Sequence, residues 1–291
     1  MPTKSPKQLF LDARDKASSQ SDGVPIRKRA NDLSGKDWIK YSISIWNDIR
    51  KDQEEASLNH PAIFPKILVT RLLACFTRAD ELNVLDPFAG SGSTLLAAMS
   101  LGKNGVGFEI NADYVALANY RRELLTGLFS PSDHGSMVMH NRDARQMLAV
   151  VPPKSIDICI TSPPYGNILT QKRTADNKQV RNYGDHSHDL GRISDYSIFI
   201  DSLSDIFASV LAALKPMGYC LVNVMDIRKG SQFFPFHSDL ANALIGLGFV
   251  FDDLLIWDRR SEYNNFRPLG YPSVFRINKA HEYILIMQKP R

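Results

Sequence analysis

The sequence predicts a doubly wound α/β fold, in which helices cover both faces of a mainly parallel sheet. Short apolar segments with the length of strands alternate with longer amphipathic segments with the length of helices. This alternation is typical of parallel sheets, because a helix makes each crossover between neighbouring strands. The chain has 291 residues, of which 44% are hydrophobic and 23% charged, as in a globular domain. We expect seven strands, the last of them antiparallel.

The first 35 residues are polar and rich in Lys, Arg, Asp and Ser. They predict an arm (1–35) ahead of a single domain (36–291). Arg27, Lys28 and Arg29 form a basic cluster in this arm. Such a cluster is more typical of a solvated surface extension than of a contact with a polyanion, and both interpretations remain open.

The first half of the domain contains four expected strands. They span residues 83–88, 105–110, 136–140 and 156–161. Two helices are expected between them, one at 92–101 and one at 111–125, where apolar side chains recur with helical spacing.

The clearest helix comes in the second half of the domain. Its apolar stripe comprises Ile198, Phe199, Leu203, Ile206, Phe207, Val210, Leu211 and Leu214. Ser194 can cap its N-terminus, while Pro216 and Gly218 follow its end. Strands are then expected at 219–225, 249–257 and 282–288, with a helix at 238–247. Residues 258–280 lack periodicity and predict a long loop that joins the last two strands as an antiparallel pair.

Charge, cysteine usage and hydropathy bound the possible partners. A net charge of +4 permits a polyanionic partner without identifying one. Cys75, Cys159 and Cys220 lie far apart in apolar segments, which favours buried free thiols over disulfides or a zinc site, so we expect no metal. With no run of about 18 apolar residues and no secretory signal, we expect a cytoplasmic protein without a membrane anchor.

A turn with two glycines joins the first expected strand to the first helix. Its sequence, Leu-Asp-Pro-Phe-Ala-Gly-Ser-Gly-Ser-Thr, covers residues 85–94. It lies at the carboxyl end of a strand, where open α/β sheets bind ligands, and Gly90 and Gly92 allow the backbone to come close to a small molecule. The turn lacks the third glycine of dinucleotide sites and the lysine of phosphate-binding loops, which argues against both.

A second turn, Ser162-Pro163-Pro164-Tyr165, follows the fourth expected strand. In isolation such a sequence is typical of a stiff turn. Here it leaves the carboxyl end of a strand beside the glycine turn, so both should line one crevice.

These two turns resemble motifs of the S-adenosylmethionine-dependent DNA amino-methyltransferases. The glycine turn resembles the motif that holds the methionine part of the cofactor, and Ser162–Tyr165 resembles the catalytic tetrapeptide. A third match, Asn-His-Pro-Ala-Ile-Phe-Pro at 59–65, precedes the glycine turn as in that family. The resemblance runs from about residue 45 to residue 287 and implies a Rossmann-like methyltransferase fold. Many relatives with the His-Pro-Ala segment have the reverse motif order, so the chain looks circularly permuted relative to them, and it lacks a long target-recognition domain.

The resemblance implies a set of cofactor-binding residues. Glu109 would accept hydrogen bonds from the ribose hydroxyls and Asp143 from the adenine amino group, although Asp143 could also be an ordinary helix N-cap. The full set is His60, Pro61, Phe64, Asp86, Pro87, Phe88, Gly90, Ser91, Gly92, Ser93, Thr94, Glu109, Ile110, Asp143 and Ala144.

The residue types of the catalytic turn suit transfer to an amine. The exocyclic amine of a base is a poor nucleophile, because its lone pair is delocalised into the ring. The Ser162 hydroxyl and the Pro163 carbonyl can accept from its two N–H groups, with Pro164 adding rigidity, and Tyr165 can stack on a base rotated out of the duplex. In the family a leading serine goes most often with cytosine N4, so we expect cytosine rather than adenine N6. Transfer to RNA or to a protein amide, and a non-catalytic nucleic-acid-binding module, remain as alternatives.

Two polar segments are candidates for DNA recognition. They span residues 166–193 and 258–280, and either could instead be an ordinary exposed loop. The candidate contacts are Lys172, Arg173, Arg181, Arg259, Arg260 and Arg267. His186 and His188 lack a third ligand nearby and predict no metal site. The expected partner is double-stranded DNA, in a prokaryotic or phage system that can include a separate restriction endonuclease, with the chain as a monomer or homodimer.

Overall fold

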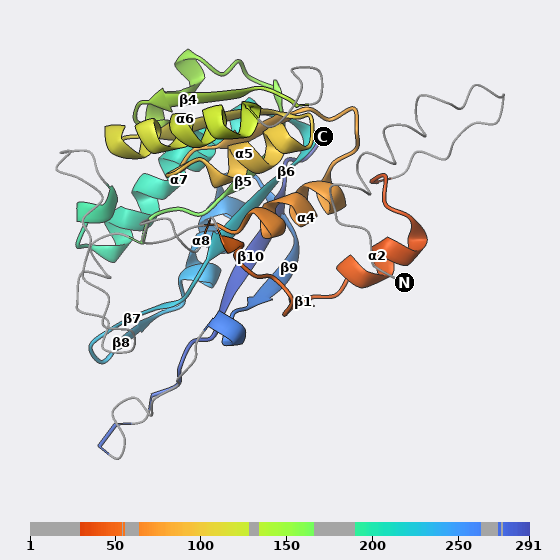
Figure 1. Cartoon of the computed structure of the whole chain (residues 1–291). Helices are drawn as coiled ribbons and strands as arrows, with labels where there is room; N and C mark the ends of the chain where they lie inside the picture. Colours follow the sequence, from red (N-terminus) through yellow and green to blue (C-terminus); the bar gives the residue numbers. More distant parts are fainter. Residues whose placement is uncertain are drawn as a thin grey trace.

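The computed structural model describes residues 30–53, 55, 64–127, 134–165, 190–262, 273–274 and 276–291. Within these ranges the largest element is an eight-stranded sheet in the order β1-β9-β10-β6-β5-β2-β3-β4 (Figure 1). Its strands are β1 (Ile45–Trp46), β2 (Asn83–Asp86), β3 (Asn104–Glu109), β4 (Met137–Asn141), β5 (Ile156–Thr161), β6 (Leu214–Val224), β9 (Val250–Asp258) and β10 (His281–Gln288).

Helices cover both faces of this sheet. They are α2 (Gly35–Tyr41), α4 (Lys66–Phe76), α5 (Ser93–Ser100), α6 (Ala112–Thr126), α7 (Tyr196–Ala213) and α8 (Phe236–Gly246), with 3₁₀ turns η1 (Ala144–Ala149), η3 (Leu190–Arg192) and η4 (Arg260–Glu262). A separate hairpin is formed by β7 (Ile227–Lys229) and β8 (Gln232–Phe234).

Alternation along the central strands builds the two layers. Leu85 and Cys159 pack in one buried cluster with α7 and α8, whereas their neighbours Val84 and Ile158 pack in another with α4 and α5. A strand that is buried on both faces needs apolar residues at every position, since successive side chains point to opposite sides. The doubly wound fold is therefore confirmed.

All seven predicted strands are present, and the last one is antiparallel as expected. β10 pairs antiparallel with both β6 and β9. The prediction missed the eighth strand, β1, which pairs parallel with β9 through Ile45 and Trp46 alone. It also missed the β7–β8 hairpin. Segments of two or three residues are too short to show a period of two, so neither gave a readable signal.

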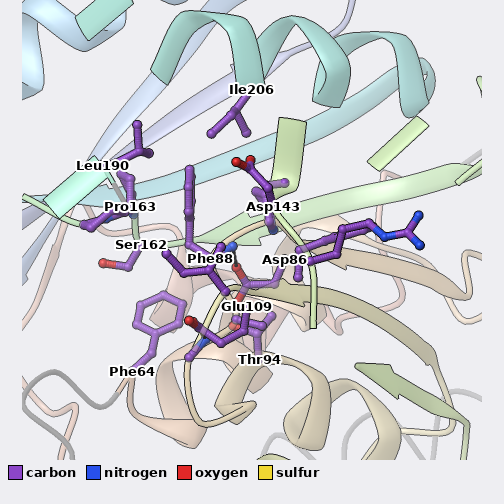
Figure 2. A pocket seen from close by; sticks show the side chains of 18 of the residues that line it. Phe64, Asp86, Phe88, Thr94, Glu109, Asp143, Ser162, Pro163, Leu190 and Ile206 are labelled. Carbon is purple, nitrogen blue, oxygen red and sulfur yellow. Dashed lines mark hydrogen bonds between the residues drawn. The ribbon is translucent and has the colours of Figure 1, made fainter. Parts of the chain in front are cut away.

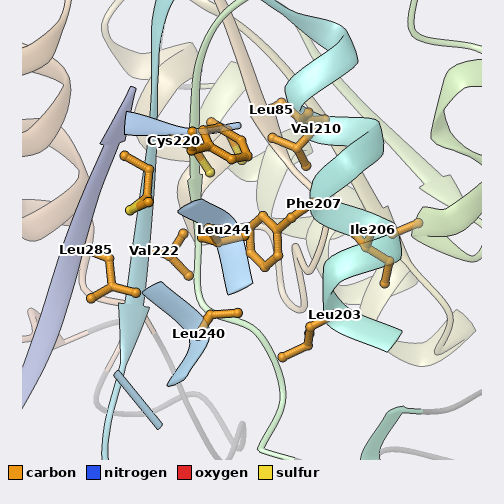
Figure 3. Close-up of a cluster of buried hydrophobic side chains, with 14 of the residues drawn as sticks. Leu85, Leu203, Ile206, Phe207, Val210, Cys220, Val222, Leu240, Leu244 and Leu285 are labelled. Atoms are coloured by element: carbon orange, nitrogen blue, oxygen red, sulfur yellow. The ribbon is translucent and has the colours of Figure 1, made fainter. Parts of the chain in front are cut away.

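Helix α7 carries most of the core on its side of the sheet. Phe199, Leu203 and Phe207 are buried, and Figure 3 shows how the side chains of α7 meet those of α8 and of the sheet. The predicted stripe was wrong at Ile198, which is 55% exposed in the first turn. The predicted cap was also wrong by one residue, because Asp195 accepts hydrogen bonds from the backbone N–H groups at the helix start.

By length and composition alone, α7 could cross a membrane, and it is the one such helix among the residues that the structure describes. No such segment was expected from the sequence. The buried stripe of α7 packs against the sheet, while Asp201 and Asp205 lie on its exposed side. This arrangement is that of an amphipathic core helix.

The three cysteines are free and buried, as predicted. Burial raises the pKa of the Cys75 thiol to about 12, so this side chain stays protonated and inert at neutral pH.

Candidate active site

A cleft opens at the carboxyl ends of β2, β3 and β5, where the two predicted turns meet (Figure 2). Its lining contains most of the predicted site residues, namely Phe64, Asp86, Pro87, Phe88, Gly90, Ser91, Ser93, Thr94, Glu109, Ile110, Asp143, Ala144, Ser162, Pro163, Pro164 and Tyr165. His60 and Pro61 lie outside the described residues. The structure thus brings together segments that are more than 70 positions apart in the sequence.

Glu109 supports the glycine turn through a hydrogen bond to its backbone. Its carboxylate accepts a hydrogen bond of 3.1 Å from the N–H of Gly90 and one of 2.8 Å from the N–H of Asn111. Gly90 has a positive φ of 50°, a conformation in which an L side chain is disfavoured. Glu109 also lines the cleft, where its carboxylate can meet a ligand.

Gly92 also has a packing role that the sequence did not predict. It does not line the cleft but forms the N-cap of α5 with a φ of 80°. A Cβ atom there would come within 2.9 Å of both the Ala118 Cβ and the Met137 Cε. Packing behind the turn therefore requires a glycine here, and the cofactor contact of Gly92 stays a prediction.

Asp86 links the two turns. Its Oδ1 accepts a 2.6 Å hydrogen bond from the Thr161 hydroxyl and a 3.0 Å hydrogen bond from the N–H of Phe88. Thr161 ends β5 and directly precedes the catalytic turn, so this contact fixes the glycine turn beside Ser162. Burial raises the pKa of Asp86 to about 6, although its hydrogen bonds oppose that shift.

The catalytic turn leaves β5 with Ser162 and ends at Tyr165. The Tyr165 ring packs edge-to-face on Phe236 of α8, with ring centroids 5.9 Å apart and an angle of 70° between the planes. This contact orients Tyr165 without burying it completely. Its ring therefore remains at the wall of the cleft, where it can meet a planar ligand.

Sequence reasoning missed several lining residues. Arg142 and Arg145 flank Asp143, while Phe108, Leu190 and Ile206 add apolar wall. Arg142 directly precedes the predicted Asp143 and Arg145 lies two positions after it, which was the available signal. Leu190 gave none, and Ile206 was assigned to the core stripe of α7, where it also belongs.

Comparison with known families agrees with this geometry. A family model described as DNA methylase, for N6 and N4 methyltransferases, matches residues 4–120 and 156–291. The matched ranges contain both turns and cover most of the chain. The chain belongs to this DNA methylase family. The family consists of S-adenosylmethionine-dependent methyltransferases. Asp143 lies between the two matched ranges and is not covered by the match.

Individual relatives match this chain over shorter stretches. It is 37% identical to the Type II methyltransferase M.BglI of Bacillus subtilis over 92 residues, which are 31% of this chain and 25% of the relative. It is 27% identical to the Type II methyltransferase M2.DpnII of Streptococcus pneumoniae over 107 residues, 33% of this chain and 40% of the relative. The chain thus spans well under half the length of these curated relatives.

Among solved structures, a putative DNA modification methylase from Thermus thermophilus, complexed with S-adenosyl-L-methionine, is 29% identical to this family member. The likeness covers 51% of this chain and 54% of the other, with a TM-score of 0.37.

In this chain, Asp143 does act as a helix cap. Its side chain accepts from the N–H of Arg145 at the start of η1 and forms an ion pair with the Arg145 guanidinium, with Nη2 and Oδ2 2.7 Å apart. Both side chains line the cleft. Any amino group that reaches Asp143 shares the carboxylate with Arg145.

Two of the predicted DNA contacts lie in the described residues. Arg259 is held internally, since it pairs with Glu262 and Glu282 and lies over the Trp257 ring. Arg260 pairs with Asp258, while 71% of its side chain is exposed. Of the two, Arg260 is better placed to reach a phosphate. Lys172, Arg173, Arg181 and Arg267 lie outside the described residues, as do His186 and His188.

Proposed function

We propose that this chain transfers a methyl group from S-adenosylmethionine to the exocyclic amino group of a base rotated out of duplex DNA, and that the base is cytosine, methylated at N4. The observation that carries the proposal is the shared cleft, in which Asp86 ties the glycine turn to the end of the strand that bears Ser162. Family membership supports the same reaction class.

The chemistry of the cleft suits a cationic nucleoside. Phe88, Phe108 and Ile110 supply apolar wall for an adenine ring, and the Glu109 carboxylate can accept from ribose hydroxyls. Asp86 and Glu109 place negative charge in the same cleft. When bound, S-adenosylmethionine supplies a methyl group on a positively charged sulfur.

The chain's own residues prepare the amine. The Ser162 hydroxyl and the Pro163 carbonyl accept its two N–H groups, which draws the nitrogen lone pair out of the ring and aims it across the cleft. Tyr165 stacks on the rotated base and excludes water from that side. The base nitrogen would form its new bond to the methyl carbon as the bond between that carbon and the sulfur breaks, with the electron pair staying on the sulfur, and the nitrogen would lose one proton to water.

Ser162 at the head of the turn supports cytosine over adenine, by resemblance to family members with that residue. The test is incubation of the chain with labelled S-adenosylmethionine and duplex DNA, RNA or protein, followed by nucleoside analysis of the product. We expect label in DNA alone, as N4-methylcytosine. N6-methyladenine would overturn the choice of base, and label in RNA or protein alone would overturn the DNA substrate.

The Type II relatives suggest the biological setting. We infer that the chain acts in a restriction-modification system, in the cytoplasm where a bacterial or phage chromosome lies, beside a separate endonuclease rather than in a stable complex with it. The names of M.BglI and M2.DpnII as Type II methyltransferases support this setting.

Glu109→Ala should lower the affinity for S-adenosylmethionine by about 10- to 100-fold, because hydrogen bonds to a charged acceptor contribute about 1.5–3 kcal/mol. The variant loses both the support of Gly90 and the acceptor for the ribose. Titration calorimetry measures the effect. Glu123→Ala, which removes the same charge from the exposed side of α6, is the matched control and should bind as the wild type does. Equal affinity of the two variants would refute the role of Glu109.

Donor binding should strengthen as the pH rises from 5 to 7. The pKa of Asp86 is raised from 3.8 to about 6, so the folded protein keeps this proton up to about pH 6 and gains a negative charge above it. If only the ionised form binds the cationic donor, the competent fraction and hence the affinity rise up to about tenfold over this range.

Asp86→Asn is the isosteric control, since it keeps an acceptor for Thr161 and should show a much flatter pH profile. The same shift makes a stability prediction. The stabilisation from the retained proton is complete below pH 3.8 and is lost as the pH rises through 6. Calorimetric titrations with S-adenosylmethionine at pH 5 and pH 7 test the binding prediction. An identical pH dependence of the affinity in wild type and Asp86→Asn would contradict it.

A further inference from the structure

The β7–β8 hairpin projects from the body of the molecule on the side of α8 (Figure 1). Its strands pair antiparallel, with Ile227 opposite Phe234 and Lys229 opposite Gln232. Gly230, with a φ of 59°, forms the tip. A two-stranded ribbon of this kind has the width that the major groove of B-DNA admits.

The root of the hairpin is fixed to the body by polar and aromatic contacts. Asp226, just before β7, accepts a 2.6 Å hydrogen bond from His237 Nδ1, just after β8. Phe234 packs on Tyr196 with ring centroids 4.6 Å apart, and the Tyr196 hydroxyl donates to Asp239 of α8. These contacts fix the base of both strands to the body of the protein, so the hairpin is a stiff projection next to α8.

The same root adjoins the catalytic turn. Phe236, the first residue of α8, is the side chain on which Tyr165 packs. Only one residue separates Phe236 from the end of β8. A duplex whose rotated base reaches Tyr165 therefore passes close to the hairpin.

All charged side chains of the hairpin and of the segment beside it are positive. Residues 227–235 and 276–280 contain Arg228, Lys229, Arg276 and Lys279 and not a single carboxylate. The two segments touch, because Lys279 Nζ lies 4.9 Å from the Phe233 ring centroid and Arg276 donates to the Gly230 carbonyl. Arg228 also lies over the Phe233 ring. Four cations from separate parts of the chain thus gather on one projection, on a protein whose net charge is only +4.

We propose that this basic hairpin, residues 227–234 with the adjoining 276–280, binds the phosphate backbone of duplex DNA beside the rotated base. The inference rests on the proposed function and deepens it, since it places the duplex on the α8 side of the cleft. The cations contact phosphates, so they contribute affinity and orientation without sequence discrimination.

The test is the salt dependence of binding to a non-specific DNA duplex, measured for the wild type and for the double variant Arg228→Ala/Lys229→Ala. Each lost phosphate contact lowers the slope of log K against log salt by about 0.9. The affinity of the double variant should therefore fall about 12-fold less than that of the wild type between 50 and 200 mM salt, as expected from about two lost contacts.

Two control variants isolate the charge and the place. Lys154→Ala/Arg291→Ala removes the same charge just before β5 and just after β10, where both side chains are exposed, and should keep the wild-type slope. Arg228→Lys/Lys229→Arg keeps the charge in the hairpin and should also keep it. The inference is overturned if the alanine hairpin variant retains the wild-type slope, or if its slope changes only with duplex RNA.

Methyl transfer separates this inference from the proposed function. A wild-type chain that methylates DNA while the hairpin variant keeps the wild-type salt slope would defeat the hairpin alone. A wild-type chain that neither binds nor methylates duplex DNA would defeat both. The hairpin variant should bind S-adenosylmethionine as the wild type does, because none of its changed residues lines the cleft.

Discussion

Tyr165→Ala should lower the rate of methyl transfer to duplex DNA by about 10- to 100-fold, because stacking of a base on an aromatic side chain contributes about 1–3 kcal/mol. The ring stands at the wall of the cleft and is oriented by Phe236. Without it, the rotated base loses its platform and its amine is no longer aimed across the cleft. Single-turnover assays with labelled S-adenosylmethionine measure the loss.

Tyr165→Phe keeps the aromatic face and serves as the matched control. It should retain most of the wild-type rate, and both variants should bind the donor with wild-type affinity, since the ring acts on the base. A Tyr165→Ala enzyme that transfers methyl groups as fast as the wild type would remove Tyr165 from the site. A loss shared equally by Tyr165→Phe would assign the role to the hydroxyl instead of the ring.

Phe207→Ala should destabilise the chain by about 3–5 kcal/mol, the usual cost of truncating a fully buried aromatic residue. Phe207 is 0% exposed at the centre of the cluster between α7 and the sheet (Figure 3). Its ring also packs edge-to-face on Phe88 of the glycine turn, with centroids 6.3 Å apart. The cavity left by the substitution therefore weakens both the core and one wall of the cleft.

Chemical denaturation of the variant gives the free energy of unfolding directly. Tyr120→Ala is the matched control, because it truncates an aromatic residue that is 59% exposed on α6. Its effect should stay within about 0.5 kcal/mol. If both substitutions lower the free energy of unfolding by the same amount, the cluster around α7 is not the main stabilising core of the protein.

The central sheet could be predicted from the sequence, because strands buried on both faces and helices with a full apolar stripe have strong hydrophobic patterns. The sequence alone was enough to assign Val84 and Leu85 to one strand and Ile158 and Cys159 to another. The short β1 was not visible, since its position depends on pairing with distant residues such as Ile256, and the strands of the β7–β8 hairpin are too short to show a period of two. Local pattern does not encode such pairing.

The candidate site could be predicted where function demands unusual residue types, as in Ser162–Tyr165 and the glycine turn. The prediction was incomplete where one residue type serves two purposes. Gly92 was predicted as a ligand contact, and the structure adds that Ala118 and Met137 behind it leave no room for a Cβ. Asp195 capped α7 although Ser194 had the same capping chemistry, and only the backbone path separates the two.

Arg145 illustrates a further limit. Its ion pair with Asp143 is local, yet nothing in the sequence shows that both side chains face the cleft. That orientation follows from the position of η1 beside β3 and α7, which is a property of the assembled sheet.

A crystal structure of the chain with S-adenosylmethionine tests the central claim most directly. The account predicts the donor in the cleft, with its ribose on Glu109 and its methyl group directed toward the Ser162–Pro163 turn, leaving room for an amine nitrogen about 3–3.5 Å away. Donor density at another place, or a methyl group that points away from Ser162, would contradict the joint use of the two turns.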